Sequence, residues 1–368
     1  MVGTSSPDAS SGDIVAVYDR KGDRFGSAFY NTHSKIALRM LAFDDRPIGE
    51  DFFRAALERA VSLRLDVLRL PEVTSAYRVV HAEGDGISGF IVDRYADVLS
   101  VQVASYGVYQ QLGRWLPILE ELLGTEQRVV AVAPGIAKAE GFRPPKDLFE
   151  NKTRPVRVEE HGIRYQVDFA AGHKTGFFCD QRDNRARLAQ LVAGRDVLDL
   201  CCYTGGFALA AKVLGGARDV IGVDLDEKAI AGAQKNANLN QTRVRWVHSD
   251  AFIYARQMIE NGRQWDVVVV DPPKFIPSRN DFEEGRRKYF DLNKLAMLLV
   301  KPGGLMVTCS CSGLLSGHDH QGIVTDAARR QKRSLQLLDS TGAGADHPVM
   351  ANCPESRYLK VLWTRLVR

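Results

Sequence analysis

The stretch DVLDLCCYTGGF, residues 196–207, joins a short apolar run to a turn that contains a pair of glycines. Four further apolar runs follow it along the chain, each separated from the next by residues with helical spacing. Strand-like and helical segments that alternate in this way are typical of a parallel, doubly wound sheet. The five runs are DVLDL, DVIGVD, VRWVHSD, WDVVVVD and GGLMVTCSC.

The regions on either side of this alternation have a different pattern. Two runs downstream, LQLLDST and YLKVLWTRLV, predict an antiparallel edge on the same sheet. Upstream, short strands, a connecting helix at about 48–70 and a mixed block of strands and helix are predicted. We therefore predict an α/β protein whose Rossmann-like domain is preceded by a small α+β domain and a partial β unit. The predicted parts are a disordered tail at 1–12, the partial β unit and connecting helix at 13–65, the central α+β domain at 66–165 and the Rossmann-like domain at 166–368.

The composition is that of a globular protein. The chain has 368 residues, of which 45% are hydrophobic and 26% charged, and its net charge is +4. No apolar run is long enough to span a membrane, and the first residues do not form a signal peptide, so we expect a cytoplasmic protein. The cysteines lie mostly in apolar surroundings and show neither a C-x-x-C pair nor zinc-site spacing, which predicts reduced thiols and no metal site.

The turn at 199–207 indicates which kind of nucleotide the sheet binds. Glycines here let a ligand approach the backbone near a helix N-terminus, but the G-x-G-x-x-G pattern of a dinucleotide site is absent. The next two strands end in Asp224, which suits two ribose hydroxyls, and Asp250, which suits an adenine amine. Either acid alone could be a solvated strand-end residue. Because ligands bind at the carboxyl edge of such sheets, the set favours S-adenosylmethionine, which has a nucleoside but no phosphate.

The fourth and fifth strands add candidate catalytic residues. VVVVDPPKF places Asp271 before two prolines, which predict a rigid loop at the mouth of the site, with a purely structural turn as the alternative. The fifth strand ends in VTCSCSG, residues 307–313, which contains Cys309 and Cys311. Since strands four and five are neighbours in such sheets, we expect Asp271 and Cys311 to converge on one cleft.

Five motifs together resemble one family, the large-subunit ribosomal RNA cytosine-5 methyltransferases of the class I, S-adenosylmethionine-dependent type. The resemblance covers roughly residues 70–368 and implies an N-terminal PUA domain, a central α+β domain and a methyltransferase domain. Residues 13 to about 44 resemble the later part of a PUA domain, so the partial β unit is expected to be PUA-like. The motifs are GHKTGFFCDQRDNR (172–185), LDLCCYTGGF (198–207), VVDPPKF (269–275), SCSGLL (310–315) and DHPV (346–349).

The resemblance implies the roles of individual residues. Cys311 occupies the cysteine of the family's S-C-S-G motif and would be the nucleophile, with Asp271 near ring nitrogen 3 of the target cytosine. Cys309 is expected to be a small buried packing residue, although period-two alternation puts it on the same side of the strand as Cys311. The residues expected to bind the cofactor are Lys174, Thr175, Asp180, Gln181, Arg182, Asp199, Tyr203, Thr204, Gly205, Gly206, Asp224, Asp250 and Asp271.

Large-subunit ribosomal RNA is the expected partner, and its target cytosine would have to be unpaired or flipped out. Two alternatives stay open, namely an enzyme of the same fold that methylates another base atom and a noncatalytic RNA-binding or ribosome-assembly protein. The sequence leaves open the modified nucleotide, naked RNA or a particle as substrate, and a monomer or homodimer as the assembly. The basic residues expected to contact RNA phosphates are Lys274, Arg286, Arg287 and Lys288, with Arg143, Lys146, Lys152 and Arg154 in the linker.

Overall fold

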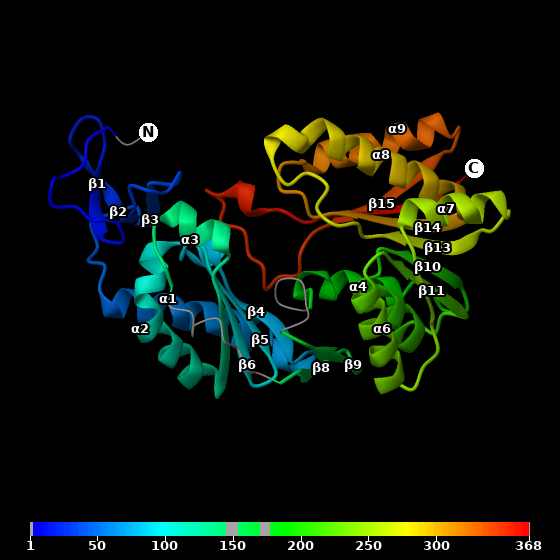
Figure 1. The fold of residues 1–368 in the computed structure, drawn as a ribbon, viewed down its shortest axis with the longest axis horizontal. Helices are drawn as coiled ribbons and strands as arrows, with labels where there is room; N and C mark the ends of the chain where they lie inside the picture. The colour runs from blue at the N-terminus through cyan, green and yellow to red at the C-terminus, as the bar shows by residue number, and fades with distance from the viewer. Residues whose placement is uncertain (1–2, 145–153, 170–176, 368) are drawn as a thin grey trace. The chain divides into compact units, whose positions relative to one another are not determined.

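The computed structural model describes residues 3–144, 154–169 and 177–367 (Figure 1). The chain divides into two compact units, and neither is one continuous segment. Unit 1 comprises Met1–Val158, Val167–Gly176 and Ala345–Ser356, and unit 2 comprises Glu159–Gln166, Phe177–Gly344 and Arg357–Arg368. The predicted division was sequential, whereas the segment that carries the DHPV motif packs in unit 1. Within the described ranges, no helix combines the length and apolar character needed to cross a membrane.

Unit 1 contains two sheets. The first is an antiparallel sheet in the order β1-β2-β3, and the second has the order β4-β5-β6-β7. β6 and β7 are parallel, because the long helix α2 connects them, while the other pairs of the second sheet are antiparallel. The strands are β1 (Ile14–Tyr18), β2 (Arg24–Tyr30), β3 (Leu38–Ala42), β4 (Ala76–His81), β5 (Phe90–Tyr95), β6 (Val98–Val103) and β7 (Gln127–Ala131).

The helices of unit 1 cover the second sheet and close its core. The helices are α1 (Glu50–Ser62), α2 (Tyr106–Leu123) and α3 (Pro134–Glu140). Trp115 of α2 is 1% exposed and lies against Phe53 of α1, with ring centroids 4.7 Å apart. α2 ends at Gly124, whose φ of +61° is a left-handed conformation that glycine adopts without strain.

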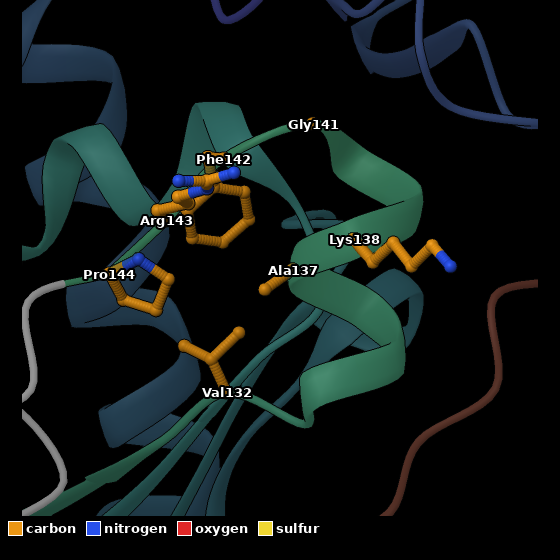
Figure 2. Close-up of a pocket in the computed structure, with 7 residues that line it drawn as sticks. All are labelled: Val132, Ala137, Lys138, Gly141, Phe142, Arg143 and Pro144. Atoms are coloured by element: carbon orange, nitrogen blue, oxygen red, sulfur yellow. The ribbon is translucent and has the colours of Figure 1, made fainter.

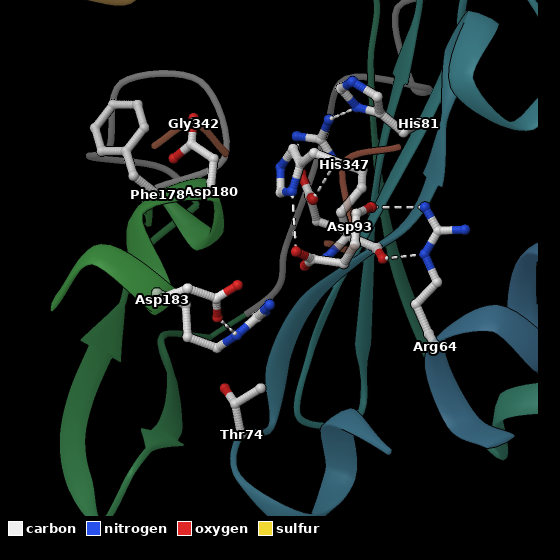
Figure 3. Close-up of polar contacts among 12 residues, drawn as sticks. Arg64, Thr74, His81, Asp93, Phe178, Asp180, Asp183, Gly342 and His347 are labelled. Atoms are coloured by element: carbon white, nitrogen blue, oxygen red, sulfur yellow. Dashed lines mark hydrogen bonds and ion pairs between the residues drawn. The ribbon is translucent and has the colours of Figure 1, made fainter. Parts of the chain in front are cut away.

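Unit 1 also buries charged side chains, and they are paired (Figure 3). The Arg64 guanidinium, with 0% of its side chain exposed, donates to both carboxylate oxygens of Asp85 at 2.6 and 2.9 Å. Arg78 donates in the same two-pronged way to Asp93. The DHPV segment joins this cluster, because the Asp346 carbonyl accepts from Arg64 and the His347 ring lies 5.0 Å from that of His81.

Unit 2 is built on a seven-stranded sheet in the order β12-β11-β10-β13-β14-β16-β15. β10 to β14 are parallel, and β16 runs antiparallel to both β14 and β15. The predicted doubly wound sheet with an antiparallel edge is therefore confirmed. The strands are β10 (Asp196–Leu200), β11 (Asp219–Asp224), β12 (Arg245–His248), β13 (Trp265–Val270), β14 (Val300–Ser310), β15 (Leu335–Thr341) and β16 (Lys360–Leu366).

Helices cover both faces of this sheet, which is why its central strands read as continuous apolar runs. Alternate residues of β13 show the two faces, since Val268 packs into one hydrophobic cluster with α7, α8 and α9, and Val267 into another with α4 and α5. A separate hairpin, β8 (Val156–Glu160) with β9 (Ile163–Val167), precedes them in the chain. The helices are α4 (Arg182–Ala189), α5 (Gly206–Leu209), α6 (Glu227–Leu239), α7 (Ala251–Glu260), α8 (Phe282–Leu298) and α9 (Gly317–Arg330).

Candidate active site

The carboxyl ends of the five parallel strands of unit 2 lie at one edge of the sheet. The residues that follow these ends are therefore brought together, although they are far apart in the sequence. The strands are followed or ended by the turn at 201–206, Asp224, Asp250, Asp271 and Cys311. Among the described residues, no group of three or more His, Cys, Asp or Glu side chains is arranged to hold a metal ion.

The turn after β10 has an unusual backbone. Cys201, Tyr203 and Gly205 have φ values of +64°, +49° and +88°, so left-handed residues alternate with ordinary ones. Left-handed non-glycine residues are strained and cluster at functional sites. A Cβ atom at Gly205 would meet the Trp246 ring at 2.6 Å, so this position requires glycine for space as well as for conformation.

Two acids beside this turn are held by backbone amides. Asp224 accepts from the N–H groups of Tyr203 and Asp226 at 2.8 and 2.9 Å, one on each carboxylate oxygen. Asp250 is the N-cap of α7, and its Oδ1 accepts from Phe252 N at 2.9 Å. These bonds fix each carboxylate in place and leave oxygen lone pairs for a ligand.

The motif at 172–185 supplies a buried polar layer at the same edge. Its part 179–181 forms a 3₁₀ turn that leads into α4, and Asp180, Gln181 and Arg182 are 9%, 4% and 2% exposed. The Gln181 amide donates to Asp271 Oδ2 at 3.2 Å. Lys174 and Thr175, also expected to bind the cofactor, lie outside the described residues.

Some carboxyl groups at this edge of the sheet are buried, but not all of their oxygens accept a hydrogen bond from the described residues. Asp199 is 1% exposed, and its Oδ2 accepts from Ala208 N at 2.9 Å. Oδ1 of Asp199 and Oδ1 of Asp180 are buried and have no hydrogen-bond partner within the described part of the chain. Burial, reinforced by the Asp271 charge, raises the pKa of Asp199 well above its usual range. Burial followed by the Asp180 charge raises the pKa of Asp271 to about 7.

The two cysteines of β14 and its end lie in different surroundings. Cys309 is 0% exposed, and its thiol donates to the Asp271 carboxyl and accepts from Gln181. Burial and the Asp271 charge together raise the pKa of Cys309 well above the ordinary thiol value. Cys311 is partly exposed. Cys309 belongs to a buried hydrophobic cluster, as expected of a packing residue, and it is also a neighbour of Asp271.

Behind Cys311 lies a cluster of polar side chains that the sequence pattern did not indicate. The Tyr289 hydroxyl of α8 and the Ser312 hydroxyl are 2.9 Å apart, and Ser312 Oγ also accepts from Ile276 N at 3.1 Å. Lys360, at the start of β16, donates to the Ser312 carbonyl. The available signal was a lysine placed within the otherwise apolar run YLKVLW.

The residues expected to contact RNA are at the surface. Lys274 is exposed in the loop after β13, and Arg286, Arg287 and Lys288 are exposed on α8, where Lys288 pairs with Glu284 at 2.7 Å. Arg154 is also exposed, whereas Lys146 and Lys152 lie outside the described residues. Arg143 belongs to unit 1 and lines a surface pocket of about 770 Å³ (Figure 2). The other residues that line this pocket are Val132, Ala137, Lys138, Gly141, Phe142 and Pro144.

Comparison with known proteins matches two parts of the chain to protein families. Residues 148–355 match the model of the S-adenosylmethionine-dependent methyltransferase family, and residues 2–43 match that of a PUA-like domain. A "Ribosomal RNA large subunit methyltransferase I" from Photobacterium profundum is 39% identical over 95% of this chain and 89% of its own length. The protein of that name from Vibrio cholerae is 37% identical over 95% of this chain and 89% of its own length.

Solved structures show the same fold. A candidate methyltransferase crystallised with SAH superposes with a TM-score of 0.83 at 21% identity, covering 97% of this chain and 92% of that one. A candidate S-adenosylmethionine-dependent methyltransferase from Streptococcus mutans gives a TM-score of 0.80 at 20% identity, covering 98% and 93%.

The site at the sheet edge fits S-adenosylmethionine chemically. The oxygens of Asp180 and Asp199 that have no partner among the described residues are acceptors suited to an ammonium group, and the Asp224 carboxylate keeps lone pairs suited to hydroxyl groups. The cofactor also carries a positive sulfonium, a charge that carboxyl groups can balance. The fold, this chemistry and the two matches agree, and the chain belongs to the large-subunit ribosomal RNA methyltransferase I family of S-adenosylmethionine-dependent methyltransferases.

Proposed function

We propose that this protein transfers a methyl group to carbon 5 of a cytosine in large-subunit ribosomal RNA through a covalent adduct with Cys311. The observation that carries the proposal is a partly exposed thiol at the carboxyl end of β14, at the strand edge that also carries Asp271. The names of the relatives supply the class of RNA, and the PUA-like match supports an RNA partner.

Carbon 5 of cytosine is a poor nucleophile, and the addition of a thiolate to carbon 6 makes it more nucleophilic. The Cys311 sulfur would donate an electron pair to carbon 6, so that a sulfur–carbon bond forms and the double-bond electrons move to carbon 5. S-adenosylmethionine, when bound, supplies an electrophilic methyl group. Loss of the carbon 5 proton to a base then restores the double bond, and the sulfur leaves with its electron pair as a thiolate.

Asp271 would supply a proton to this sequence. An acid beside ring nitrogen 3 stabilises the negative charge that develops when the thiolate adds to the ring. With a pKa raised to about 7 by burial and the Asp180 charge, Asp271 carries a proton on a large fraction of molecules at neutral pH. Gln181 and Cys309 hold its carboxyl group in place through hydrogen bonds.

The cofactor and the RNA would be held by separate sets of residues. The cofactor would be held by the residues at the carboxyl edge of the sheet, namely Asp180, Gln181, Arg182, Asp199, Asp224, Asp250 and the turn Tyr203, Thr204, Gly205 and Gly206. Lys274 and the exposed cations of α8 would contact RNA phosphates.

The test is methylation of large-subunit ribosomal RNA with labelled S-adenosylmethionine by the wild-type protein, Cys311→Ala and Cys309→Ala. We expect Cys311→Ala to abolish incorporation while Cys309→Ala keeps a measurable rate, and digestion of the product to yield 5-methylcytidine. RNA that contains 5-fluorocytidine has no removable proton at carbon 5 and should be trapped on Cys311. Labelling that survives Cys311→Ala, or a label found on an exocyclic amine, would refute the proposal.

A further inference from the structure

A buried lysine lies beside the end of β14. β16 runs antiparallel to β14, with Lys360 opposite Ser310, so Lys360 begins its strand where β14 ends, one residue before Cys311. Its Nζ donates to the Ser312 carbonyl at 2.6 Å and to the Tyr358 carbonyl at 2.8 Å. These two bonds hold the ammonium group at the backbone of the residue that follows Cys311.

Among the residues that the structure describes, no carboxylate pairs with this ammonium. Lys360 is 6% exposed, and buried lysines are normally paired with an acid. Within the described part of the chain, Lys360 forms no ion pair, and its two acceptors are neutral carbonyls. An ammonium has three donors, so one N–H remains for a further acceptor. Burial lowers the pKa of Lys360 to about 8, the nearby Cys311 sulfur acts in the opposite direction and the Lys274 charge adds to the lowering.

In the described ranges, the other titratable groups that face this pair are Lys274, Tyr289 and His320. Tyr289 of α8 has a pKa raised by burial, and its hydroxyl lies beside Ser312. His320 of α9 is 0% exposed, and burial followed by the Lys360 charge lowers its pKa to about 3. His320 is therefore neutral at neutral pH and Tyr289 keeps its proton, so neither supplies the charge that Lys360 lacks.

We propose that Lys360 is the counter-ion of the Cys311 thiolate and thereby a positioning residue for the nucleophile. The inference rests on the proposed function of Cys311. The Cys311 proton leaves to solvent, the sulfur keeps the electron pair, and the ammonium beside it neutralises the resulting charge. The same ammonium faces the sulfur again when the adduct breaks and the thiolate reforms.

This arrangement distinguishes the roles of Cys309 and Cys311, which the sequence spacing alone does not distinguish. Cys309 faces the Asp271 carboxyl, a neighbour that disfavours a second negative charge and keeps the group a thiol. Cys311 faces Lys360, with Lys274 nearby, and cations favour the thiolate that attacks carbon 6.

The test measures the thiol pKa of Cys311 directly. The full-length protein is alkylated with iodoacetamide across pH 5–10, and the rate at Cys311 is read by peptide mass spectrometry in wild type, Lys360→Met and Lys360→Arg. The matched control is Lys212→Met, because Lys212 Nζ also donates to two carbonyls, those of Ala217 and Arg218. We expect the Cys311 midpoint in wild type to lie below the ordinary thiol value of about 8.5.

We expect Lys360→Met to raise this midpoint by one unit or more, Lys360→Arg to restore most of the shift and Lys212→Met to leave it at the wild-type value. The pH profile of ribosomal RNA methylation should move to higher pH in Lys360→Met by the same amount. An unshifted midpoint in folded Lys360→Met would overturn the proposal. An ordinary midpoint in wild type would overturn it too, even if Lys360→Met failed to fold.

The readout also distinguishes this inference from the proposed function. The alkylation midpoint of Cys311 could depend on Lys360 while the Cys311→Ala variant still methylates RNA. This result would support the ion pair and refute the role of Cys311 as the nucleophile. An inactive Cys311→Ala variant with a midpoint independent of Lys360 would support the nucleophile and refute the ion pair.

Discussion

The buried charges of unit 1 are paired, and so are Arg185 and Glu160 in unit 2, but among the described residues the carboxyl groups at the strand edge of unit 2 are not. In unit 1, Arg64 and Asp85 satisfy each other through two hydrogen bonds, and Arg78 and Asp93 do the same. In unit 2, the carboxyl groups at the strand edge lie close enough to raise one another's pKa, and Oδ1 of Asp199 lacks a partner among the described residues. A satisfied buried pair holds a fold together, whereas an unsatisfied buried acceptor is a place where a ligand completes the structure.

The difference predicts opposite responses to mutation. Removing one member of a satisfied pair leaves its partner buried and uncompensated, which lowers stability. Removing a buried carboxyl group that is repelled by neighbouring carboxylates takes away this repulsion. The stability of the protein should therefore stay the same or rise, while its affinity for the cofactor falls. Four experiments test this contrast, and the largest effect is expected in unit 1.

Arg64→Met should lower the free energy of unfolding by about 3–5 kcal/mol, since Asp85 would keep a buried charge without its partner. The matched control is Arg54→Met, because Arg54 is 47% exposed and its nearest carboxylate oxygen lies 3.9 Å away, so the change should stay within about 0.5 kcal/mol. Urea unfolding followed by circular dichroism gives both values. Equal midpoints for the two variants would show that the Arg64 pair does not hold the unit together.

Asp271→Asn should stabilise the protein more at pH 8 than at pH 5. The pKa of Asp271 rises from 3.8 in the unfolded chain to about 7 in the folded one. Between these values the folded state binds more protons than the unfolded state, so this group's contribution to stability is lost as the pH rises from about 4 to 7. The asparagine has no charge to lose, and the variant should gain roughly 2–3 kcal/mol relative to wild type between pH 5 and pH 8.

Thermal unfolding of both proteins at the two pH values measures this difference, and constant effects of the substitution cancel in it. Asp219→Asn is the control, because Asp219 is a surface residue with 58% of its side chain exposed. A gain that is the same at pH 5 and pH 8 would mean that Asp271 does not titrate in this range.

Asp199→Asn should weaken S-adenosylmethionine binding about tenfold or more, because a charge-assisted hydrogen bond is worth roughly 1.5–3 kcal/mol. Stability at neutral pH should hold or rise, since burial raises the pKa of this acid. Asp196→Asn is the control on the same strand, at the end away from the site, where Asp196 pairs with exposed Arg218. Calorimetry with the cofactor separates the two variants, and equal affinities would remove Asp199 from the cofactor site.

The sheet and its edge could be predicted because their sequence signal is local. Val267 to Val270 form a continuous apolar run since helices cover both faces of β13. Of the two C-terminal runs, β16 pairs with β14 and β15 pairs with β16. The position of Asp271 at the sheet edge follows from the strand order, which the alternation of strands and helices implies.

The interactions of single side chains could not be predicted in the same way. Spacing puts Cys309 and Cys311 on one side of β14, but their neighbours come from the 3₁₀ turn at 179–181 and from the start of β16, far away in sequence. The DHPV segment lies near the C-terminus and packs in unit 1, because Asp346 accepts from the Arg78 N–H and Arg64 bonds to its carbonyl. Such pairings depend on tertiary contacts that no local pattern encodes.

The smallest predicted effect concerns Asp250, which could serve the fold, the cofactor or both. It caps α7 through bonds to Phe252 N and Ile253 N, and Asp226 caps α6 in the same way through Lys228 N and Ala229 N. Serine also caps a helix, so Asp250→Ser and Asp226→Ser should each change stability by less than about 0.5 kcal/mol, whereas alanine at either position should cost about 1 kcal/mol.

If the Asp250 carboxylate binds the adenine amine, Asp250→Ser should lower cofactor affinity several-fold while Asp226→Ser leaves it unchanged. Calorimetry with S-adenosylmethionine on the four variants, together with their thermal midpoints, separates the two roles. Equal cofactor affinities for the two serine variants would show that Asp250 serves only as a helix cap, so that its role is structural, as is that of the paired acids of unit 1. A loss of affinity confined to Asp250→Ser would show that Asp250 binds the cofactor, as expected of Asp199.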